Sequence, residues 1–259
     1  MKKITILGNG NIAFAIAKGL VNNYELEIIG RDIKKLENFR KNIGADINIS
    51  EYGKNFIIDG KNIILAVKPN NINSISPLLQ GKAENIFSVL AGTKIADIKK
   101  KIASKSYVRA MPNLSALFQE SMTSITGDIH SKSIAINIFS NIGSTIWLES
   151  EDEVDIATAI AGSGPAYLSL IAESIADGGV KAGLKRKDSE KLVLGLFKGF
   201  SPLLEKYKAS DIKDSVMSPK GTTAYGYSAL EESNVRNSFI KAIESAHQRA
   251  VDLGKPIQI

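Results

Sequence analysis

The sequence contains no cysteine and only two histidines, and both shortages exclude chemistry. Without cysteine there is no disulfide framework, thiolate metal site, iron–sulfur cluster or cysteine nucleophile. His130 and His247 have no carboxylate or second histidine at metal-ligand spacing, so no metal site is predicted. The sequence also lacks an uninterrupted apolar run of about 20 residues, the length that spans a bilayer. We therefore expect a cytoplasmic protein that binds no membrane and no metal.

Charge indicates the kind of partner. The 259 residues carry 33 Lys and Arg against 27 Asp and Glu, a formal net charge of +6. The lysines are scattered through predicted helices and loops and are not grouped with aromatic residues, as a nucleic-acid surface would require. A small anionic ligand is therefore expected, and nucleic acid is not.

The first half of the chain predicts an α/β domain over residues 1–150. Short apolar, β-branched runs alternate with polar, helix-permissive segments, a pattern typical of a parallel sheet with crossover helices. The predicted strands cover residues 3–7, 25–30, 62–67, 85–90, 107–110, 122–125 and 144–148.

The second half predicts an all-helical domain over residues 151–259. Apolar residues recur every three or four positions, as in the stripe from Leu168 to Ala176 and the stripe from Phe239 to Leu253. These stripes offer more apolar surface than an isolated helical layer can bury, so we expect a homodimer through this half, with a higher oligomer left open.

A glycine turn follows the first predicted strand and opens a helix. In Gly8-x-Gly10-x-x-Ala13, Gly8 makes the tight turn, Gly10 lets the backbone approach a pyrophosphate, and Ala13 allows close helix packing. Asn11 and Ile12 complete the turn, and the helix N-terminus supplies an anion site. This placement predicts a Rossmann-type dinucleotide-binding domain, and the alternative is a glycine turn without a ligand.

The end of the second strand bears on the choice of cofactor. An acid there would bind the ribose 2'-hydroxyl of NAD, but the strand ends in Gly30-Arg31-Asp32. Arg31 suits a 2'-phosphate, which favours NADPH over NADH, although Asp32 weighs against it and Arg31 as a solvated loop residue is the alternative. Ala66, Val67, Lys68 and Pro69 end another strand at the same sheet edge and are expected to contact the cofactor, with Lys68 facing either an anion or solvent.

Two glycine- and serine-containing segments mark the helical half. Residues 161–167 (AGSGPAY) predict a helix start capped by Ser163 with Pro165 in the first turn. Residues 218–223 (SPKGTT) gather free N–H groups and hydroxyls before another helix, which predicts a cradle for a small anion.

Taken together, the motifs resemble those of pyrroline-5-carboxylate reductase along the whole chain. The matching segments are GNGNIA at 8–13, AVKP at 66–69, AGTKI at 91–95, RAMPN at 109–113, AGSGPAY at 161–167 and SPKGTT at 218–223. The resemblance implies NAD(P)H-dependent reduction of the cyclic imine 1-pyrroline-5-carboxylate to L-proline, by an N-terminal Rossmann domain followed by a helical domain that binds substrate and dimerises.

The resemblance also implies roles for individual residues. Ser218 and the N–H groups of Gly221, Thr222 and Thr223 would bind the substrate carboxylate, and the Thr223 hydroxyl would meet the ring nitrogen as the catalytic group. The alternative role of Thr223 is helix capping. Met111, Pro112 and Asn113 would border the nicotinamide. The chain departs from the family pattern at Leu114, Ser115, Ser215 and Lys220, where contacts are in doubt.

Three other functions remain open at this stage. A β-hydroxyacid dehydrogenase shares the two-domain plan, but Lys181, Lys185 and Lys198 lack the glycine setting of its catalytic lysine. A non-catalytic NADP-binding sensor would bind cofactor without turnover. A reductase of a related cyclic imine, such as the six-membered homologue, would use the same residues.

Overall fold

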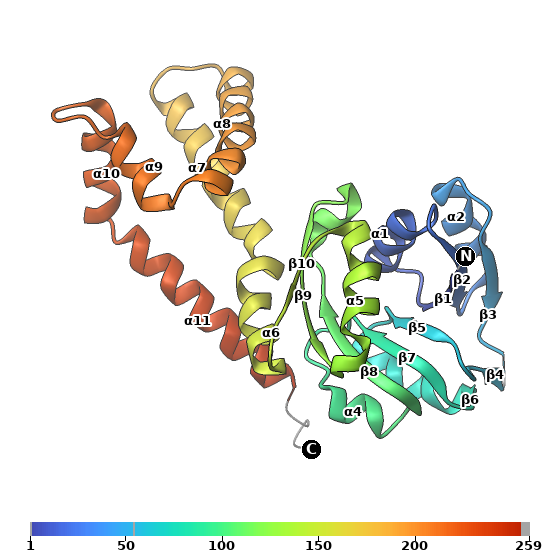
Figure 1. The fold of residues 1–259 in the computed structure, drawn as a ribbon. Coiled ribbons are helices and arrows are strands. Elements are labelled where there is room, and N and C mark those ends of the chain that lie inside the picture. The colour runs from blue at the N-terminus through green and yellow to red at the C-terminus, as the bar shows by residue number, and fades with distance from the viewer. Residues whose placement is uncertain (1, 54, 255–259) are drawn as a thin grey trace. The chain divides into compact units, whose positions relative to one another are not determined.

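The computed structural model describes residues 2–53 and 55–254, which contacts divide into two compact units. The first unit holds the chain up to Ser163 together with the C-terminal segment from Ala246. The second holds Gly164–Ser245. An α/β part followed by helices is the fold class that the sequence predicts (Figure 1).

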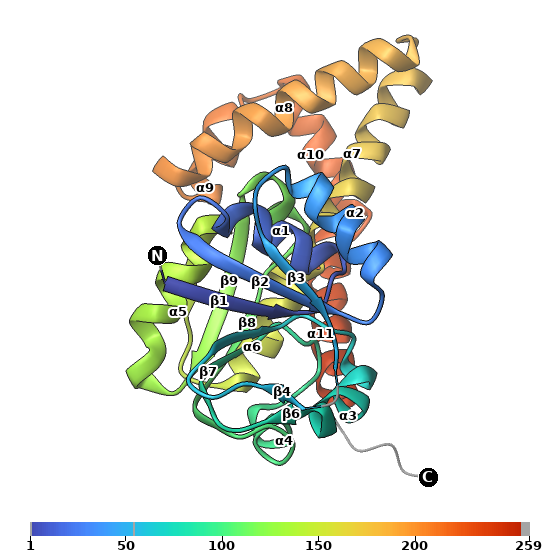
Figure 2. The same ribbon diagram turned by 90° about the vertical axis from the view of Figure 1, so that its right-hand side faces the viewer.

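The first unit is built on an eight-stranded sheet with the order β10-β9-β8-β7-β5-β1-β2-β3. Figure 2 labels the strands β9, β8, β7, β1, β2 and β3 of this sheet. A separate two-stranded sheet pairs β4 with β6. The strands are β1 (Lys2–Leu7), β2 (Tyr24–Gly30), β3 (Asn48–Glu51), β4 (Phe56–Ile57), β5 (Asn62–Leu65), β6 (Leu79–Gln80), β7 (Ala83–Ser88), β8 (Ser104–Met111), β9 (Ser121–Gly127) and β10 (Gly143–Trp147).

Helices cover both faces of the large sheet. The helices are α1 (Asn11–Leu20), α2 (Ile33–Ile43), α3 (Ile72–Ile75), α4 (Ile95–Lys99), α5 (Lys132–Phe139), α6 (Glu151–Ala157), α7 (Gly164–Lys181), α8 (Arg186–Lys206), α9 (Ala209–Val216), α10 (Thr222–Glu232) and α11 (Val235–Leu253). One apolar core joins the sheet to α1, α2 and α5, and a second joins it to α3 and α4. Apolar residues on alternate sides of the central strands supply both cores, which is why these strands read as continuous apolar runs.

Two features of the sheet differ from the sequence expectation. β8 and β9 pair antiparallel, whereas the other described neighbours in this sheet are parallel. The link between them, residues 112–120, holds a short 3-10 helix η3 (Leu114–Phe118) and is too short for a parallel crossover, which takes a dozen or more residues. β3 was not predicted, because this four-residue edge strand carries mixed polar residues and no apolar run.

The expected capping of the helix start by Ser163 is wrong, although α7 does begin at the next residue, Gly164, with Pro165 in its first turn. α6 continues into a π-helical turn, η6 (Thr158–Gly162), and the Ser163 N–H donates to the Thr158 carbonyl at 3.0 Å. Ser163 has right-handed helical angles, φ −86° and ψ −22°, so its backbone ends η6 in a helical conformation and does not form an N-cap. π-helical turns are rare and frequently occur at functional sites.

The run Glu151–Lys181 also has an unexpected composition. It is 31 residues long, and the mean hydropathy of its most apolar window is 1.3. By length and composition alone, it is able to cross a membrane. Within the structure, 17% of that window is buried. The sequence shows no uninterrupted apolar stretch here because serine, threonine and glycine are dispersed along the run. One such helix is weak evidence for a membrane segment, since helices that pair with other protein surfaces have the same composition.

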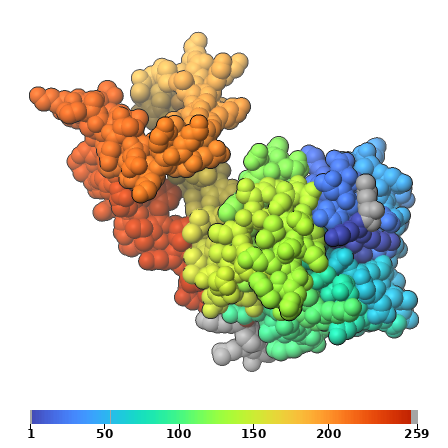
Figure 3. All heavy atoms as spheres, in the orientation of Figure 1, coloured from blue at the N-terminus to red at the C-terminus, as the bar shows by residue number. Residues whose placement is uncertain are grey.

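The second unit is helical throughout its regular structure. It contains α7 to α10 and the first part of α11, and α7 packs against α8. In the space-filling view, its atoms are those coloured from yellow to red-orange (Figure 3). Large apolar side chains stay exposed on α7 and α8: Leu168, Leu170, Ile175, Leu192, Leu194, Leu196, Phe200, Leu203 and Leu204.

Candidate active site

The glycine turn is in direct contact with another predicted cofactor segment. The Gly8 N–H donates to the Ile29 carbonyl at 2.8 Å, and the Ala66 N–H donates to the Leu7 carbonyl at 2.9 Å. Gly8 has φ +125°, and a Cβ built on it would lie 2.4 Å from the carbonyl oxygen of Ala66. The turn after β1 and the segment after β5 therefore meet at the carboxyl edge of the sheet, and only glycine fits at their contact.

Gly10 has a different environment. It is the N-cap of α1, with φ −82° and ψ −176°, and a Cβ built on it would meet no atom within 4 Å. The N–H groups of Asn11, Ile12 and Ala13 have no backbone acceptor among the described residues. Unpaired N–H groups at a helix start, facing open space, form an anion-binding site.

A cavity of about 1010 Å³ opens at this edge of the sheet. Of the cofactor residues predicted from the sequence, those that line it are Gly8, Gly10, Asn11, Arg31, Ala66, Val67 and Lys68. Ala13 lies in the core, where it allows α1 to pack, and Ile12 packs partly buried against the same core. Pro69 begins the 3-10 helix η1 (Pro69–Asn71).

Other lining residues were not predicted. They include Asn9, Lys34, Lys35, Tyr52 and Asn71. Asn9 lies inside the glycine turn, Lys34 and Lys35 come three and four residues after Arg31, and Asn71 comes two residues after Pro69, so proximity in sequence is a usable signal for these four. Tyr52 comes from a segment that no sequence pattern connects to the turn.

Charges around the end of β2 favour a bound anion. Arg31, Lys34, Lys35 and Lys68 line the cavity and bring positive charge to it. Asp32, which the sequence set against NADPH, caps α2: its Oδ1 accepts the Lys35 N–H at 3.2 Å. With its carboxylate bound to the Lys35 N–H, Asp32 is less available for a ribose hydroxyl.

Tyr52 contributes a buried hydroxyl without a partner. Its Oη is shielded from solvent and has no hydrogen-bond partner among the described residues. Burial raises the pKa of Tyr52 well above its usual value, and nearby Arg31 partly opposes that shift. An unpaired buried hydroxyl costs about 1–3 kcal/mol, so a polar ligand group at this end of the cavity would remove a cost that the protein alone bears. The unpaired Tyr52 hydroxyl and the open space beside Gly10 are features that a bound dinucleotide would fill.

Met111 ends β8, Pro112 and Asn113 follow it, and hydrogen bonds hold Asn113 in place. Asn113 Nδ2 donates to the Ala161 carbonyl at 3.0 Å, and Asn113 Oδ1 accepts the Ser115 N–H at 3.1 Å. Four residues after Ala161 comes Pro165, which has no N–H to give to that carbonyl, so Asn113 supplies the missing donor. Met111 and Pro112 are buried. The Asn113 amide therefore retains one free Oδ1 lone pair for a ligand.

The predicted anion cradle lies in the second unit, at the start of α10. Pro219 and Lys220 occupy a turn closed by the Gly221 N–H, which donates to the Ser218 carbonyl at 2.9 Å. That bond corrects one expectation, because the Gly221 N–H is already used and is not free for a carboxylate. The N–H groups of Thr222 and Thr223 have no backbone acceptor in the part of the chain that the structure describes.

Gly221 serves the cradle in another way. A Cβ built on it would lie 2.3 Å from the Ser218 hydroxyl oxygen, so the missing side chain lets that hydroxyl approach the helix start. Among the residues that the structure describes, no side chain caps α10, and both threonines are exposed. Helix capping, the alternative role of the Thr223 hydroxyl, is therefore not what this hydroxyl does here.

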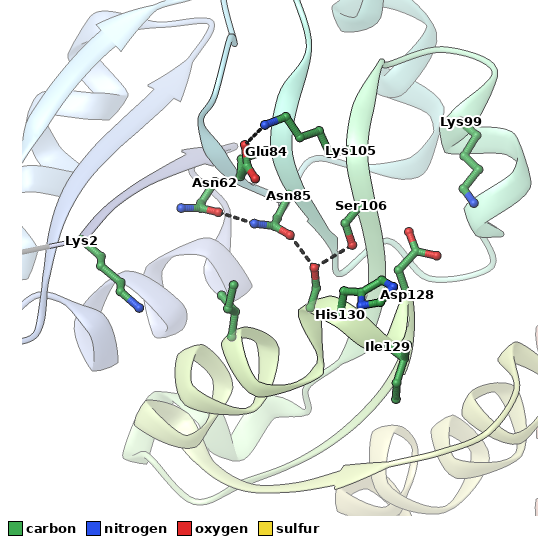
Figure 4. A pocket seen from close by; sticks show the side chains of 12 residues that line it. Lys2, Asn62, Glu84, Asn85, Lys99, Lys105, Ser106, Asp128, Ile129 and His130 are labelled. Carbon is green, nitrogen blue, oxygen red and sulfur yellow. Dashed lines mark hydrogen bonds and ion pairs between the residues drawn. The ribbon is translucent and has the colours of Figure 1, made fainter.

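A second cavity, of about 870 Å³, opens at the opposite edge of the sheet (Figure 4). Asn85 Nδ2 donates to Asn62 Oδ1 at 2.7 Å, and the Ser131 hydroxyl bonds Asn85 Oδ1 at 2.5 Å and Ser106 Oγ at 2.6 Å. These buried polar groups satisfy one another and join α5 to the sheet. Their hydrogen bonds need no ligand, in contrast to the Tyr52 hydroxyl and the free N–H groups of α1.

Comparison with known proteins assigns both halves of the chain. Residues 3–92 match the family "NADP oxidoreductase coenzyme F420-dependent", and residues 151–253 match "Pyrroline-5-carboxylate reductase dimerisation". The second match covers the whole apolar run Glu151–Lys181 and the exposed apolar faces of α7 and α8.

Full-length relatives agree with these matches. The pyrroline-5-carboxylate reductase of Helicobacter pylori J99 is 36% identical over 93% of this chain and 96% of its own length, and that of Synechocystis is 37% identical over 74% and 75%. The structure is similar to the Coxiella burnetii enzyme, with a TM-score of 0.84, 29% identity and 98% of both chains covered. It is also similar to the NADP-bound Plasmodium falciparum pyrroline carboxylate reductase, with a TM-score of 0.79, 29% identity, and 98% and 100% coverage. The chain belongs to the pyrroline-5-carboxylate reductase family.

Proposed function

We propose that this protein reduces 1-pyrroline-5-carboxylate to L-proline with hydride from NADPH. The observation that carries the proposal is the family match along nearly the whole chain, at 36% identity over 93% of its residues. A shared Rossmann-type domain alone would leave the substrate open, because the same domain serves many reactions. The match extends through both the nucleotide half and the helical half, and so covers the residues assigned to each ligand.

Three observations in the first unit and one comparison support NADPH as the cofactor. Gly10 leaves open space beside the free N–H groups of α1, where a pyrophosphate would bind. Arg31 lines the cavity near the unpaired Tyr52 hydroxyl, which suits a 2'-phosphate. Asp32 is occupied as a helix cap. The similar Plasmodium falciparum enzyme has NADP bound.

The residues around the nicotinamide act by positioning. When bound, the cofactor supplies the hydride that adds to the imine carbon, and the imine nitrogen gains a proton. Asn113 is fixed by Ala161 and Ser115 and keeps an Oδ1 lone pair for the carboxamide. Buried Met111 and Pro112 keep water from this end of β8.

The start of α10 supplies the substrate contacts. The free N–H groups of Thr222 and Thr223, with the Ser218 hydroxyl beside Gly221, bind the carboxylate. The Thr223 hydroxyl hydrogen-bonds the ring nitrogen and relays its proton from solvent. A protonated cyclic imine is already electrophilic, so the reaction needs no strong acid and suits a chain with little histidine and no cysteine.

The exposed apolar faces of α7 and α8 support a homodimer through the helical unit. Apolar patches of this kind mark protein interfaces, and the family matched over residues 151–253 is a dimerisation domain. A dimer rather than a membrane contact is therefore our proposal for Glu151–Lys181, with a cytoplasmic location.

The test is turnover by the purified full chain. Loss of reduced-nicotinamide absorbance is followed with 1-pyrroline-5-carboxylate and either NADPH or NADH, and proline is identified by mass spectrometry. The proposal predicts stoichiometric proline and a higher kcat/KM with NADPH. Cofactor binding without proline would contradict it and favour a sensor, whereas turnover of the six-membered imine alone would reassign the substrate.

A further inference from the structure

Arg109 is the most deeply buried arginine of the first unit, and the proposed chemistry does not use it. It lies in the middle of β8 with 1% of its side chain exposed. Its Nη2 donates to Asp155 Oδ1 of α6 at 2.5 Å, and Asp155 is itself 3% exposed. Nη1 lies 3.7 Å from Oε1 of Glu151, at the start of α6.

This buried ion pair is incomplete. Arg109 Nε and Nη1 have no hydrogen-bond partner among the described residues, although both are shielded from water. Burying a charge is costly unless its donors are satisfied, and apolar side chains of similar volume often replace buried ion pairs without loss of stability. Stability is therefore a poor explanation for an arginine at this position.

The geometry around the pair gives a better explanation. Four residues after Arg109, Asn113 donates to the Ala161 carbonyl of η6, the turn that continues α6. Glu151 Oε1 accepts the Ile95 N–H at 2.9 Å. The helical segment 151–162 thus holds both the end of β8 and the turn after β7. Arg109 is the charged contact between β8 and this helical segment.

A second ion pair also joins the turn after β7 to α6. Lys94 Nζ lies 3.2 Å from Asp152 Oδ1, one residue along α6 from Glu151. A Cβ built on Gly92, in the same turn as Lys94, would lie 2.7 Å from Leu253 Cβ, so this turn is packed closely as well as hydrogen-bonded. The turn after β7 and the end of β8, which carries the proposed nicotinamide residue Asn113, are therefore both held by α6 and the turn that continues it.

We propose that Arg109, through Asp155 and Glu151, is a positioning residue that sets Asn113 and the turn before Ile95 for hydride transfer. This inference rests on the proposed function, because it assigns the nicotinamide to that edge of the sheet. The guanidinium touches neither cofactor nor substrate; it holds the strand end that does. A shift of about 1 Å in such a contact lowers turnover by about 100-fold.

The experiment removes both charges at once. In Arg109→Met/Asp155→Leu neither of the two fully buried charges is left without its partner, and the partly exposed Glu151 keeps its hydrogen bond from the Ile95 N–H, so we expect a melting temperature near that of the wild type. We expect kcat to fall by about 10- to 100-fold with little change in KM for the imine. The isotope effect on kcat with NADPH deuterated at the transferred hydrogen should rise, because hydride transfer becomes slower than the other steps.

Lys105 and Glu84 supply the matched control. Lys105 is on the same strand as Arg109, and its Nζ lies 2.8 Å from Glu84 Oε2, but both side chains are largely exposed at the opposite edge of the sheet. Lys105→Met/Glu84→Gln should therefore leave kcat, KM and the isotope effect unchanged. A similar loss of kcat in this control would overturn the inference.

Binding separates failure of this inference from failure of the proposed function. Fluorescence titration of the full-length wild type and double variant should show weaker NADPH binding in the variant, but 2',5'-ADP affinity within about twofold, because only the nicotinamide end moves. That comparison holds even if the wild type reduces no imine. A double variant with wild-type kcat and wild-type NADPH affinity would show that the pair is merely structural.

If the double variant does not fold, two single variants test the inference in its place. Arg109→Lys keeps the charge and loses the planar fork, and Glu151→Gln keeps an acceptor for the Ile95 N–H while removing the anion. Both should stay folded with a reduced kcat. If the loss of activity in both variants is no larger than the loss of folded protein, the inference is overturned.

Discussion

Gly8 and Ala66 are in backbone contact, with 2.4 Å between a Cβ built on Gly8 and the Ala66 carbonyl oxygen, whereas a Cβ built on Gly10 meets nothing within 4 Å. The two glycines of one turn therefore serve different purposes. Gly8 lets two segments of the fold meet. Gly10 leaves the space that a cofactor pyrophosphate needs. A side chain at Gly8 should therefore lower the stability of the fold, whereas a side chain at Gly10 should lower the affinity for the cofactor.

Gly10→Ala should fold normally and fail to bind. Its φ of −82° suits any residue, so we expect stability within about 1 kcal/mol of the wild type and an NADPH dissociation constant raised at least about 10-fold. Gly8→Ala is the contrast, because φ +125° and the clash with Ala66 should cost about 1–3 kcal/mol. Urea unfolding and fluorescence titration measure both effects. Unchanged NADPH affinity in Gly10→Ala would place the pyrophosphate elsewhere.

Arg31→Ala tests cofactor preference. If the guanidinium binds the 2'-phosphate, NADPH affinity should fall by about 10- to 100-fold, as expected for a lost hydrogen bond between charged groups. NADH affinity should stay within about twofold. Lys18, a cation on α1 outside the cavity lining, is a control site for net charge through Lys18→Ala. Equal losses for NADPH and NADH would refute 2'-phosphate recognition by Arg31.

Thr223→Ala tests the proposed catalytic hydroxyl. We expect kcat to fall by about 10- to 100-fold, because the relay to the ring nitrogen is lost while the backbone N–H remains. Thr223→Ser keeps the hydroxyl and should retain most of the turnover. NADPH affinity should not change in either variant. Steady-state kinetics with 1-pyrroline-5-carboxylate measure the effect, and a fully active Thr223→Ala would remove this residue from the mechanism.

Seven of the ten described strands, all of them except β3, β4 and β6, were predictable because their apolar runs are a local property. Residues 25–30 and 144–148, for example, differ from the observed Tyr24–Gly30 and Gly143–Trp147 by one residue at each shifted end. β9 illustrates the limit. Its residues form a strand on local grounds, but its antiparallel direction depends on the length and path of the link from Met111 to Ser121.

The site was predictable where its residues lie within one motif. Gly8, Gly10 and Arg31 are placed at the cavity as the strand–turn–helix pattern predicts. Asp32 was ambiguous because capping of α2 and ribose binding use the same carboxylate, and only the structure shows the bond to Lys35. The Arg109–Asp155 pair joins residues 46 positions apart, and no periodicity connects them.

Glu27→Gln should reveal a pH-dependent part of the stability. Burial alone raises the pKa of Glu27, but hydrogen bonds from Lys61 and Thr5, with the charges of Lys61 and Lys3, outweigh burial and lower it. A carboxyl whose pKa is lowered by folding stabilises the native state above its unfolded pKa, and this contribution is lost as pH falls through the folded pKa. At neutral pH, the free energy of unfolding of the wild type should therefore exceed that of Glu27→Gln by about 1–2 kcal/mol.

Urea unfolding at neutral pH and at about pH 3 measures this difference, which should shrink in acid as the Glu27 carboxyl becomes protonated. Glu25→Gln is the matched control: Glu25 lies on the same strand, but its ion pair with Lys3 is 3.5 Å long and exposed. A stability difference for Glu27→Gln that stays constant with pH would contradict the role of its charge.

Lys220→Gly should stabilise the protein, because Lys220 occupies a backbone conformation that favours glycine. Its φ is +61°, at the third position of a turn with Pro219 second and a hydrogen bond from Gly221 to Ser218. Turns with proline second and a positive φ third usually have glycine there, since a Cβ costs about 1 kcal/mol. We expect a melting temperature about 2–4 °C higher. Lys220→Asn should lie between the two, because asparagine tolerates this conformation better than lysine. Lys220→Gln removes the charge and keeps the strain, so a rise in melting temperature for Lys220→Gln equal to that for Lys220→Gly would show that charge, and not backbone conformation, sets the stability here.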